Sequence, residues 1–572
     1  MKKLSFFVLT SVFLLLVVSV GYAQTPPAPQ TAGGVVQQEK QRIQQQKLKD
    51  RIETDRPVAK EVAEEDVVIP DKGPQVKIDK IVVEGATLLT SRQIMAITGE
   101  YEGKKLSIKD MQKVADLITD EYRKKGYVTS RAYIPPQSIQ NNTLVIRIIE
   151  GKLGQLDISG NRHFKTALLK KKIGIKPAGY FDYSALQRSL VYINESPDRQ
   201  ARAILVPGKA PGTTDVVIEV EDQLPIHIGF NYDNWGSRYI DRNRYSVIFE
   251  HNNLLGQDDK LDAKFQWAEA ERLVLQQARY VFPLTSNWEL GAYMLFSRLK
   301  LGEEFQDLES KGRADIFGAF TNYAIIEGDD LEVRLNLGFD SKNISNELSG
   351  TQISRDELRI VKSGFDMDLE DSWGRTILTA EWDVGLANFM GSLDDKDPDC
   401  SRTGAGGKFH KKVFNLFRLQ PMPFTSSLLL KNSFQYSNYN LPASEQFQIG
   451  GATSVRGYPP AEFAGDKGFY SAIEWSFPMY GLSKKVKVPF RPEERLYDAL
   501  RLVMFWDIGM VDHNNPQAGE KDTQTLRAAG VGCRLNLKKN LDFRIEIAWP
   551  LDDPTPSDGD HAHTWVEFNW KF

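Results

Sequence analysis

Cysteine is nearly absent from the sequence, since Cys400 and Cys533 are the only two among 572 residues. Cys400 lies in the polar segment DPDC, and Cys533 lies in the strand-like segment GVGCRLNL. One pair of cysteines does not support a disulfide framework or a zinc site. We expect two free thiols, with a single disulfide between them as the alternative.

Sequence signatures of enzymes and of nucleic-acid-binding proteins are also missing. The sequence contains no G-x-S-x-G nucleophile segment and no glycine-rich phosphate loop. Its closest histidine pair, His561 and His563, lies beside Asp558 and Asp560, where we expect a solvated loop, with a metal site as the alternative. The net charge of −4 does not favour nucleic acid as a partner. We therefore predict a protein without catalytic residues, cofactors or bound metal.

Long apolar runs are confined to the first residues of the chain. MKKLSFFVLTSVFLLLVVSVGYAQ has two lysines, an apolar core and small residues before a cleavage position after Ala23. This pattern predicts a signal peptide over residues 1–23, with a membrane anchor helix as the alternative. No later run approaches the roughly 20 apolar residues that a membrane helix needs. The protein is therefore predicted to be exported, and any later contact with a membrane does not use helices.

Residues 24–75 are predicted to hold one polar helix and a linker. A spacer rich in proline and glycine leads into a stretch rich in glutamine and lysine, with good helix propensity over about 30–53. Its sparse apolar residues form only a thin stripe: Val36, Ile43, Leu48 and Ile52. Such a helix lies in water or in a polar cavity, not in a hydrophobic core. The rest of the segment is typical of an extended linker.

Residues 76–153 and 154–224 repeat one pattern. Each copy contains a strand, two helices and two further strands, and its last two strands flank a turn that contains proline. The longer helix is SIKDMQKVADLITDEYRKKGY in the first copy and DYSALQRSLVYINES in the second. The repeat predicts two small α+β domains in tandem.

From residue 225 to residue 572, short segments of alternating apolar and polar residues are separated by Gly, Asp, Asn and Ser. In LDFRIEIAW, for example, one face carries only apolar side chains and the other carries Asp, Arg and Glu. The last segment, TWVEFNWKF, has the same period and ends with Trp570 and Phe572. A period of two residues indicates β-strands with one wholly apolar face and one charged face.

We predict that this region is a transmembrane antiparallel β-barrel. A lipid-facing apolar band around a polar lumen explains both strand faces. At roughly 20 to 22 residues for each strand and its turn, the region accommodates about 16 strands. A soluble β-sandwich or a soluble barrel is the alternative, but the predicted export, the number of long strands and the aromatic last strand disfavour both.

One charged residue in this region needs a partner. QIGGATSVRGYPPA, residues 448–461, contains Arg456 in a stretch with almost no other charge. Inside a barrel this charge needs compensation, because the confined water lowers the local dielectric. In RLVMFWDIGMV, alternation directs Asp507 inward between Phe505 and Gly509. We predict that Arg456 and Asp507 form a bidentate ion pair. The alternative is that Arg456 lies in a solvated surface loop and Asp507 lines a water-filled lumen.

Together these features resemble the outer-membrane transporters of two-partner secretion, the ShlB/FhaC/HecB family of the POTRA–β-barrel superfamily. The resemblance covers essentially the whole mature chain and is carried by IGGATSVRGY, FWDIG, NNLLGQDDKL and NESPDRQARAIL. In the last of these, Ser196 replaces an asparagine that is usual in the family. The resemblance implies that a loop over about 446–466 folds back into the lumen, where Arg456 and Asp507 form a lock. It also implies that this lock is supported by Val455, Gly457, Tyr458, Phe505 and Gly509. In the second domain, the family motif corresponds to Asn194, Pro197 and Arg199. At the C-terminus, Trp570 and Phe572 belong to a signal for barrel assembly.

The resemblance further implies a function. The domains at 76–153 and 154–224 correspond to POTRA domains in the Gram-negative periplasm, which receive an unfolded exoprotein of the adhesin or cytolysin type. The helix at about 30–53 plugs the pore at rest, and transport uses no ATP. Implied partners are outer-membrane lipids and, during biogenesis, the barrel-assembly machinery and periplasmic chaperones, and the protein is expected to be a monomer. One alternative is an assembly factor or insertase of the same superfamily, although such proteins typically have more POTRA domains. The other alternative is a passive channel, although a channel needs no POTRA domain.

Overall fold

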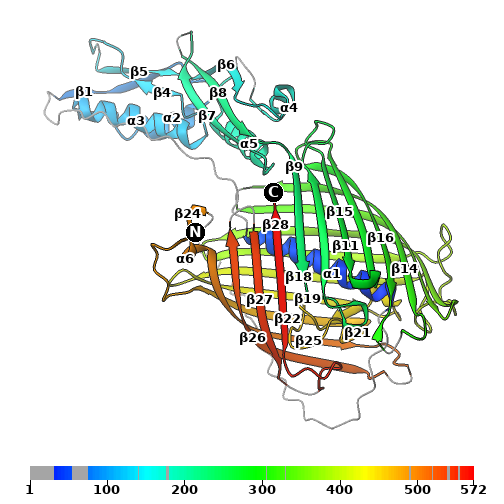
Figure 1. Cartoon of the computed structure of the whole chain (residues 1–572). Helices are drawn as coiled ribbons and strands as arrows, with labels where there is room; N and C mark the ends of the chain where they lie inside the picture. Colours follow the sequence, from blue (N-terminus) through cyan, green and yellow to red (C-terminus); the bar gives the residue numbers. More distant parts are fainter. Residues whose placement is uncertain are drawn as a thin grey trace.

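The computed structural model describes residues 31–53 and 75–572, apart from gaps at 140, 176–178, 211, 304–305, 329, 489–490, 518–519, 538–540 and 552–553. The predicted signal peptide, residues 1–23, and most of the predicted linker lie outside the described residues. Two α+β units stand at one end of a large β-barrel, and a helix lies inside the barrel (Figure 1).

Sixteen antiparallel strands form a closed barrel. The last strand pairs with the first, from Glu567 opposite Asp233 to Lys571 opposite Gly229, so the wall has no free edge to face lipid. The predicted fold class and strand number are therefore confirmed. The wall strands are β9 (Ile226–Asp233), β10 (Arg244–His251), β11 (Lys260–Ala268), β12 (Leu273–Pro283), β13 (Trp288–Lys300), β14 (Lys311–Glu327), β15 (Leu331–Leu348), β16 (Thr351–Asp371), β17 (Gly374–Gly385), β18 (Phe409–Met422), β19 (Ser426–Ser437), β22 (Lys467–Pro478), β25 (Leu500–Asp512), β26 (Thr523–Leu537), β27 (Leu541–Pro550) and β28 (His563–Lys571).

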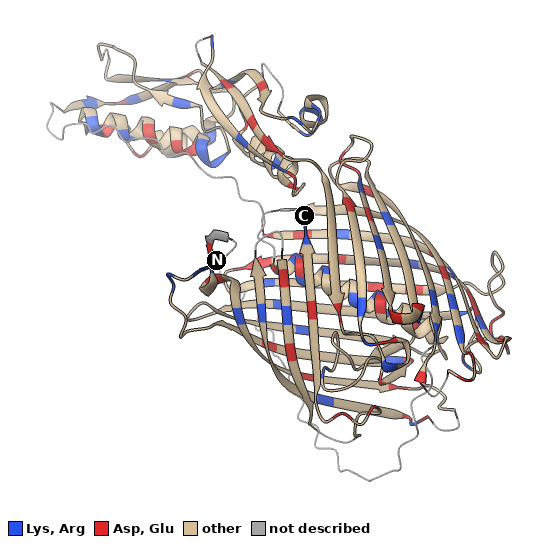
Figure 2. Cartoon of the chain, viewed as in Figure 1, with Lys and Arg blue, Asp and Glu red and all other residues tan. Residues whose placement is uncertain are grey.

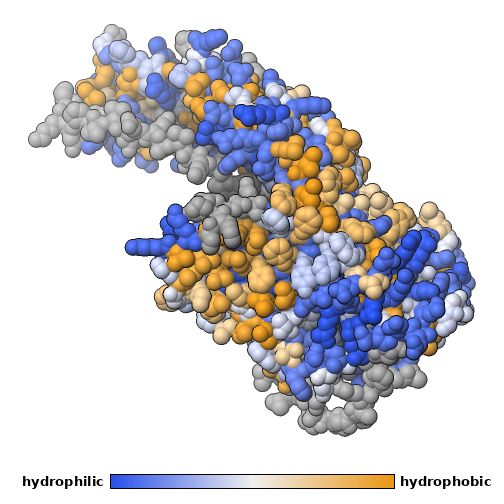
Figure 3. All heavy atoms as spheres, in the orientation of Figure 1, coloured by the Kyte–Doolittle hydropathy of each residue, from blue (hydrophilic) through white to orange (hydrophobic). Residues whose placement is uncertain are grey.

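Side chains alternate between the two faces of the wall, as the sequence pattern predicts. On β25, Met504 and Trp506 are exposed on the outside, whereas Phe505 and Asp507 are buried on the lumen side. Apolar side chains gather on the outer wall at the end near the α+β units, and polar ones gather at the far end (Figure 3). Lysine, arginine, aspartate and glutamate occur along most wall strands (Figure 2). Because the outer face is apolar, these charges belong to the lumen and to the loops.

The first α+β unit has the predicted order of elements, with two differences: the first predicted strand is divided into β1 and β2, and a short strand, β3, lies between the two helices. Its elements are β1 (Val76–Ile78), β2 (Lys80–Glu84), α2 (Ser91–Thr98), β3 (Lys104–Leu106), α3 (Ile108–Lys124), β4 (Arg131–Tyr133) and β5 (Thr143–Ile149). The predicted strand SRAYIPPQSI is shorter than expected, because Pro135 and Pro136 have no N–H to donate to a ladder. A core that includes Val114, Ile118 and Ile146 belongs to this unit alone.

The second α+β unit has the predicted order of elements and its own core. Its elements are β6 (Lys152–Ser159), α4 (Thr166–Lys171), α5 (Tyr183–Asn194), β7 (Arg199–Pro207) and β8 (Thr213–Asp222). β8 is the central strand of three, parallel to β6 and antiparallel to β7. Phe164, Leu186 and Val216 lie in the core between the sheet and the helices.

Helix α1 (Ala32–Glu53) lies inside the barrel (Figure 1), at the position that the sequence predicts for a polar helix. Near its start, Val35 and Val36 pack with inward residues of β12 to β15. Near its end, Leu48 and Ile52 pack with inward residues of β17 to β19 at the opposite end of the barrel. The helix therefore crosses the lumen from one end to the other. Among the described residues, no helix combines the length and apolar character that crossing a membrane requires.

Strand β15 allows a direct test of which strand face contacts lipid and which faces the lumen. Leu335 faces outward and is exposed, whereas its neighbour Asn336 faces the lumen. We expect Leu335→Arg to lower the free energy of unfolding by about 2–4 kcal/mol, because the lipid interior does not solvate a guanidinium. Guanidinium-induced unfolding of the reconstituted barrel measures this change. Asn336→Arg is the matched control and should cost less than about 1 kcal/mol; equal losses for both variants would contradict the assignment of faces.

Candidate functional site

The segment between β19 and β22 turns back into the barrel. Within it, β20 (Phe447–Ile449) pairs with β21 (Phe463–Gly465), and the connection between them carries the VRGY motif. We call residues 446–466 the lumenal loop. Gly450 and Gly451 have φ values of 105° and 93°, a left-handed conformation that glycine adopts without strain. These two glycines allow the chain to turn into the lumen.

Arg456 lies at the tip of the lumenal loop and contacts Asp507 of β25. Its Nε donates to Asp507 Oδ2 over 2.8 Å, and its Nη2 donates to Asp507 Oδ1 over 2.6 Å. The backbone N–H of Arg456 donates a third hydrogen bond to the same carboxylate, over 3.1 Å. Arg456 is 1% exposed and Asp507 is 0% exposed, so the pair is bidentate and shielded from bulk water.

The guanidinium of Arg456 has two further carboxylate partners. Nη1 lies 2.9 Å from Oε1 of Glu474 on β22 and 3.0 Å from Oε2 of Glu546 on β27. Arg534 bridges the same two glutamates from β26, and Lys431 of β19 lies 2.5 Å from Glu474. We call these six residues the Arg456 cluster. With three cations and three anions it is electrically balanced, which buried charges require.

Four members of the cluster were not predicted: Glu474, Glu546, Arg534 and Lys431. Alternation along LDFRIEIAW already directs Glu546 inward, and the same rule directs Glu474 inward. Alternation does not say how deep in the barrel a residue lies. That depth depends on the register between strands, which pairs Glu474 with Phe505 and Gly532 with Glu546.

The aromatic ring beneath the guanidinium is Phe505. The Cζ atom of Arg456 lies 3.4 Å from the centre of this ring, in the geometry of a cation–π contact. The ring in turn covers Gly530 of β26, where an added Cβ would lie 2.3 Å from Phe505 Cζ. Trp565 of β28, a residue that the sequence did not single out, donates from Nε1 to the backbone oxygen of Arg456 over 2.7 Å.

The remaining lock-support residues pack the lumenal loop against the wall. Val455 and Tyr458 are fully buried in a cluster with Ile449. A Cβ on Gly509 would lie 2.7 Å from Val455 Cγ2, and one on Gly457 would lie 2.7 Å from the backbone nitrogen of Pro550. The two glycines therefore provide the space for close contact between loop and wall.

Helix α1 packs directly on the lumenal loop. The side chain of Gln448 donates from Nε2 to the backbone oxygen of Gly34 over 3.1 Å. A Cβ on Gly33 would lie 3.1 Å from the backbone nitrogen of Ser444, which precedes the loop. The start of the helix and the loop thus share one contact surface inside the barrel.

Along the rest of its length, α1 is held by ion pairs with the wall. Glu39 lies 2.8 Å from Lys264 of β11, and Arg51 lies 3.0 Å from Asp368 of β16. Arg42 lies 3.6 Å from Asp233 of β9. A polar helix is accommodated here because the lumen provides the opposite charges.

The motif residues Asn194, Pro197 and Arg199 lie where the second α+β unit meets the barrel. Arg199 donates from Nη2 to Asp258 over 2.6 Å, and Lys172 lies 2.7 Å from the same carboxylate. Burial alone would raise the pKa of Asp258, but the hydrogen bonds and charges of Arg199 and Lys172 hold that pKa below its ordinary value.

The neighbouring residues strengthen this connection. Asp198 accepts from Asn252 Nδ2 over 2.7 Å and lies 2.5 Å from His227 Nε2 at the start of β9. Asn194 instead pairs with the backbone of Ala201 within its own unit, and Pro197 begins the turn that leads into β7. Of the motif residues, Arg199 therefore connects the second unit to the β10–β11 turn, together with the neighbouring Asp198.

The C-terminal residues Trp570 and Phe572 lie at the seam between β28 and β9. Their rings are 4.2 Å apart, both are exposed on the outer face, and Phe572 packs on Phe230 of β9. The backbone N–H of Phe572 donates to Ile228 over 2.9 Å. The last residue is thereby held against the strand that closes the barrel.

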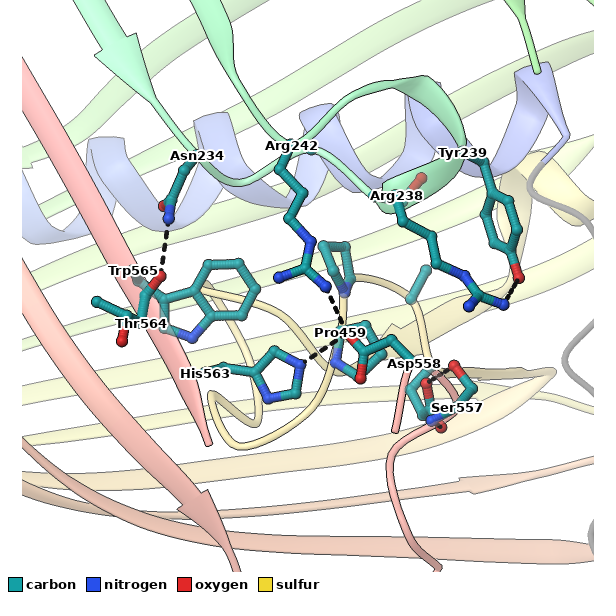
Figure 4. A pocket seen from close by; sticks show the side chains of 15 residues that line it. Asn234, Arg238, Tyr239, Arg242, Pro459, Ser557, Asp558, His563, Thr564 and Trp565 are labelled. Carbon is teal, nitrogen blue, oxygen red and sulfur yellow. Dashed lines mark hydrogen bonds and ion pairs between the residues drawn. The ribbon is translucent and has the colours of Figure 1, made fainter. Parts of the chain in front are cut away.

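A pocket near the other end of the seam contains the histidine that was expected in a solvated loop (Figure 4). That expectation is wrong for His563, which is buried and lies 3.0 Å from Asp558. Asp558, Asp560 and His563 lie close enough to share a metal ion, but Arg242 pairs with both carboxylates, over 3.1 and 3.0 Å, and compensates one of their two negative charges. Both cysteines are free thiols, as expected.

The Arg456 cluster predicts strong energetic coupling between the loop and the wall. We expect Arg456→Ala to lower the free energy of unfolding by about 3–5 kcal/mol, because it leaves buried carboxylates short of one cation. The double variant Arg456→Ala/Asp507→Ala should lose less than the sum of the two single variants, since a cation and an anion leave together. Guanidinium-induced unfolding of the reconstituted barrel provides all three values. Additive losses would contradict the pairing.

Comparison with known proteins identifies the family. The family described as "Haemolysin secretion/activation protein ShlB/FhaC/HecB" matches residues 212–535, and "POTRA domain, ShlB-type" matches residues 76–151. The heme/hemopexin transporter protein HuxB of Haemophilus influenzae is 22% identical over 477 residues, 81% of each chain. The outer membrane transporter CdiB of Dickeya dadantii is 23% identical over 426 residues, 72% of this chain and 75% of the relative.

A solved structure has the same fold. CdiB from Escherichia coli is 20% identical, with a TM-score of 0.74 over 95% of this chain and 100% of the other. The structural match thus agrees with the overall fold, and the POTRA match agrees with the first α+β unit. Since the family match covers more than half of the sequence, the chain belongs to the ShlB/FhaC/HecB family of haemolysin secretion/activation proteins, the outer-membrane transporters of two-partner secretion.

Proposed function

We propose that this outer-membrane transporter receives an unfolded exoprotein at its periplasmic POTRA units and passes it through the barrel to the cell surface. The observation that carries the proposal is that α1 crosses the lumen and packs on the lumenal loop, through Gln448 and Gly34. We assign α1 as the plug of the pore and the Arg456–Asp507 pair as the lock that holds the loop. The exoprotein is of the adhesin or cytolysin type.

The proposed division of the chain follows from these roles. Residues 1–23 are the signal peptide, and residues 24–75 hold the plug helix and the linker. Residues 76–153 and 154–224 are the two POTRA domains, and residues 225–572 are the barrel. The chain acts as a monomer without cofactor or catalytic residues, since the lumen of one copy contains the plug, the lock and the path.

Entry of the substrate uses a free strand edge of a POTRA unit. An extended chain adds to such an edge through main-chain hydrogen bonds, which demand little of its sequence. The edge strand beside α5 is β7, in the sheet order β6-β8-β7. We favour β7 because it has nine residues and exposes Ile204, Leu205 and Val206, whereas β4, the edge strand beside α3, has three residues.

Transport through the barrel needs no ATP, which the periplasm does not supply. The substrate folds outside the cell, and a folded product does not return through the pore. Helix α1 can leave the lumen because polar contacts hold it along most of its length, and water can replace them. During biogenesis, periplasmic chaperones deliver the chain, and the barrel-assembly machinery recognises the final strand with Trp570 and Phe572.

Substitution of Arg456 tests the lock. We expect Arg456→Ala to abolish secretion of the exoprotein while the barrel still assembles, because the loop loses its attachment to the wall. Secreted exoprotein in the culture medium and heat-modifiable mobility of the folded barrel are measured together. Arg279→Ala is the matched control, since Arg279 is a lumenal arginine paired with Asp262 at 3.8 Å, outside the Arg456 cluster. Normal secretion by Arg456→Ala would overturn the lock.

Deletion of residues 30–53 tests the plug. We expect the single-channel conductance in planar bilayers to increase, because the helix that occupies the lumen is gone. The triple variant Glu39→Ala/Arg42→Ala/Arg51→Ala removes the charged contacts of α1 with the wall and should open more often than the wild type without a larger maximum conductance. If the deletion left the conductance unchanged, the result would favour an insertase. If the wild type already had the conductance of the deletion variant, the result would favour a passive channel.

A further inference from the structure

Three periplasmic turns on one side of the barrel expose large aromatic side chains. Trp373 of the β16–β17 turn is 73% exposed, Phe424 of the β18–β19 turn is 84% exposed, and Tyr480 after β22 is 55% exposed. The turns are neighbours, since β17 pairs with β18 and β19 pairs with β22. Tyr480 Oη also donates to the backbone oxygen of Phe424 over 3.1 Å. The three exposed rings therefore lie on neighbouring turns, and we call them the aromatic row.

A basic hairpin lies next to this row, between β22 and β25. It contains β23 (Lys487–Val488), β24 (Arg491–Arg495) and the short helix α6 (Leu496–Ala499). Residues 484–498 carry five basic and three acidic side chains, a net charge of +2. The side chains of Lys484, Lys485 and Lys487 are exposed. A loop tip with basic residues projects beside the apolar wall in the region of α6 (Figures 2 and 3).

These lysines are positioned by packing, although they project into solvent. Val488 and Ala499 are buried against Leu537 of β26, which fastens the hairpin to the wall. Lys484 Nζ lies 5.1 Å from the centre of the Tyr497 ring. Within the described part of the chain, the ammonium groups of the three lysines have no carboxylate partner, although Glu494 and Asp498 belong to the same hairpin. The backbone that carries the three lysines is therefore fastened to the wall, and among the described side chains no carboxylate pairs with their ammonium groups.

The hairpin is also tied to the aromatic row. Arg501, at the start of β25, donates from Nη2 to the backbone oxygen of Thr425 over 2.8 Å, beside Phe424. Another part of the rim carries the opposite charge, since the β14–β15 turn exposes Glu327 and Asp330. The cations and the aromatic row therefore occupy the same sector of the rim.

Aromatic rings at a barrel rim lie at the level of the lipid headgroups. Lysines next to such a belt are attracted to anionic headgroups over roughly one Debye length, about 8 Å at physiological ionic strength. We propose that Lys484, Lys485 and Lys487, with Trp373, Phe424 and Tyr480, form a binding surface for anionic phospholipids of the periplasmic leaflet. The aromatic rings pack at the boundary of the acyl chains, and the ammonium groups pair with the phosphate diesters. This surface fixes one side of the barrel in the membrane, independently of the substrate.

Native mass spectrometry of the purified full-length transporter tests the proposal. Phosphatidylglycerol is titrated, and the dissociation constant of the first bound lipid is measured, with phosphatidylcholine as the zwitterionic reference. We expect the wild type to prefer phosphatidylglycerol, with a preference that falls as salt is added. Lys484→Gln/Lys485→Gln/Lys487→Gln should weaken binding of phosphatidylglycerol by at least about fivefold, the effect of one lysine near an anionic surface. Binding of phosphatidylcholine should not change.

The control removes the same number of charges elsewhere. Lys311, Lys396 and Lys408 are exposed at the opposite end of the barrel, and their triple glutamine variant should keep the preference of the wild type. Heat-modifiable mobility confirms that every variant contains a folded barrel. Equal binding of phosphatidylglycerol by the wild type and the first variant would overturn the proposal. If that variant kept the lipid preference but secreted less exoprotein, the hairpin would be a polypeptide contact and not a lipid site.

Discussion

A charge inside a narrow lumen has to be neutralised by neighbouring side chains, because little water is available to do it. Arg456 meets this requirement with Asp507, Glu474 and Glu546, which belong to three different wall strands. A single side chain at the tip of the loop therefore connects the loop to β22, β25 and β27. The loop in turn forms the surface on which α1 begins, so the contents of the lumen depend on the position of one guanidinium.

The same requirement explains how a helix with so few apolar residues is ordered. A helix that is polar on most of its surface gains little from hydrophobic burial, and its stability depends on its partners. Inside this barrel those partners are charges on the wall, such as Lys264 for Glu39 and Asp368 for Arg51. Contacts of this kind are also ones that water can replace. A plug bound mainly by such contacts leaves without exposing a large apolar surface, which suits the proposed role of α1.

Outside the lumen, the periplasmic rim carries two separate charged features. On one side, Arg199 and Lys172 hold the second POTRA unit to Asp258 in the β10–β11 turn. In another sector, the exposed lysines Lys484, Lys485 and Lys487 lie on the same side of the rim as the exposed aromatic rings. The contact at Asp258 joins parts of the same chain, whereas the lysines face the surroundings. The rim therefore combines a fixed attachment for the substrate-receiving units with a surface that suits the membrane.

The sequence by itself determined the fold class, the approximate strand number, the faces of the strands and the polar helix, because these depend on periodicities of two and 3.6 residues that are local to each segment. It also predicted that Arg456 pairs with Asp507, since one inward carboxylate lay next to a glycine and the family resemblance named the same pair. Glu474, Glu546, Arg534, Lys431 and Trp565 were decided only by the tertiary structure. Alternation tells whether a side chain faces the lumen, but its depth is set by hydrogen-bond register between strands that are distant in the chain. For the same reason, the contacts of α1 with the lumenal loop and of Arg199 with Asp258 could not be inferred before the barrel closed.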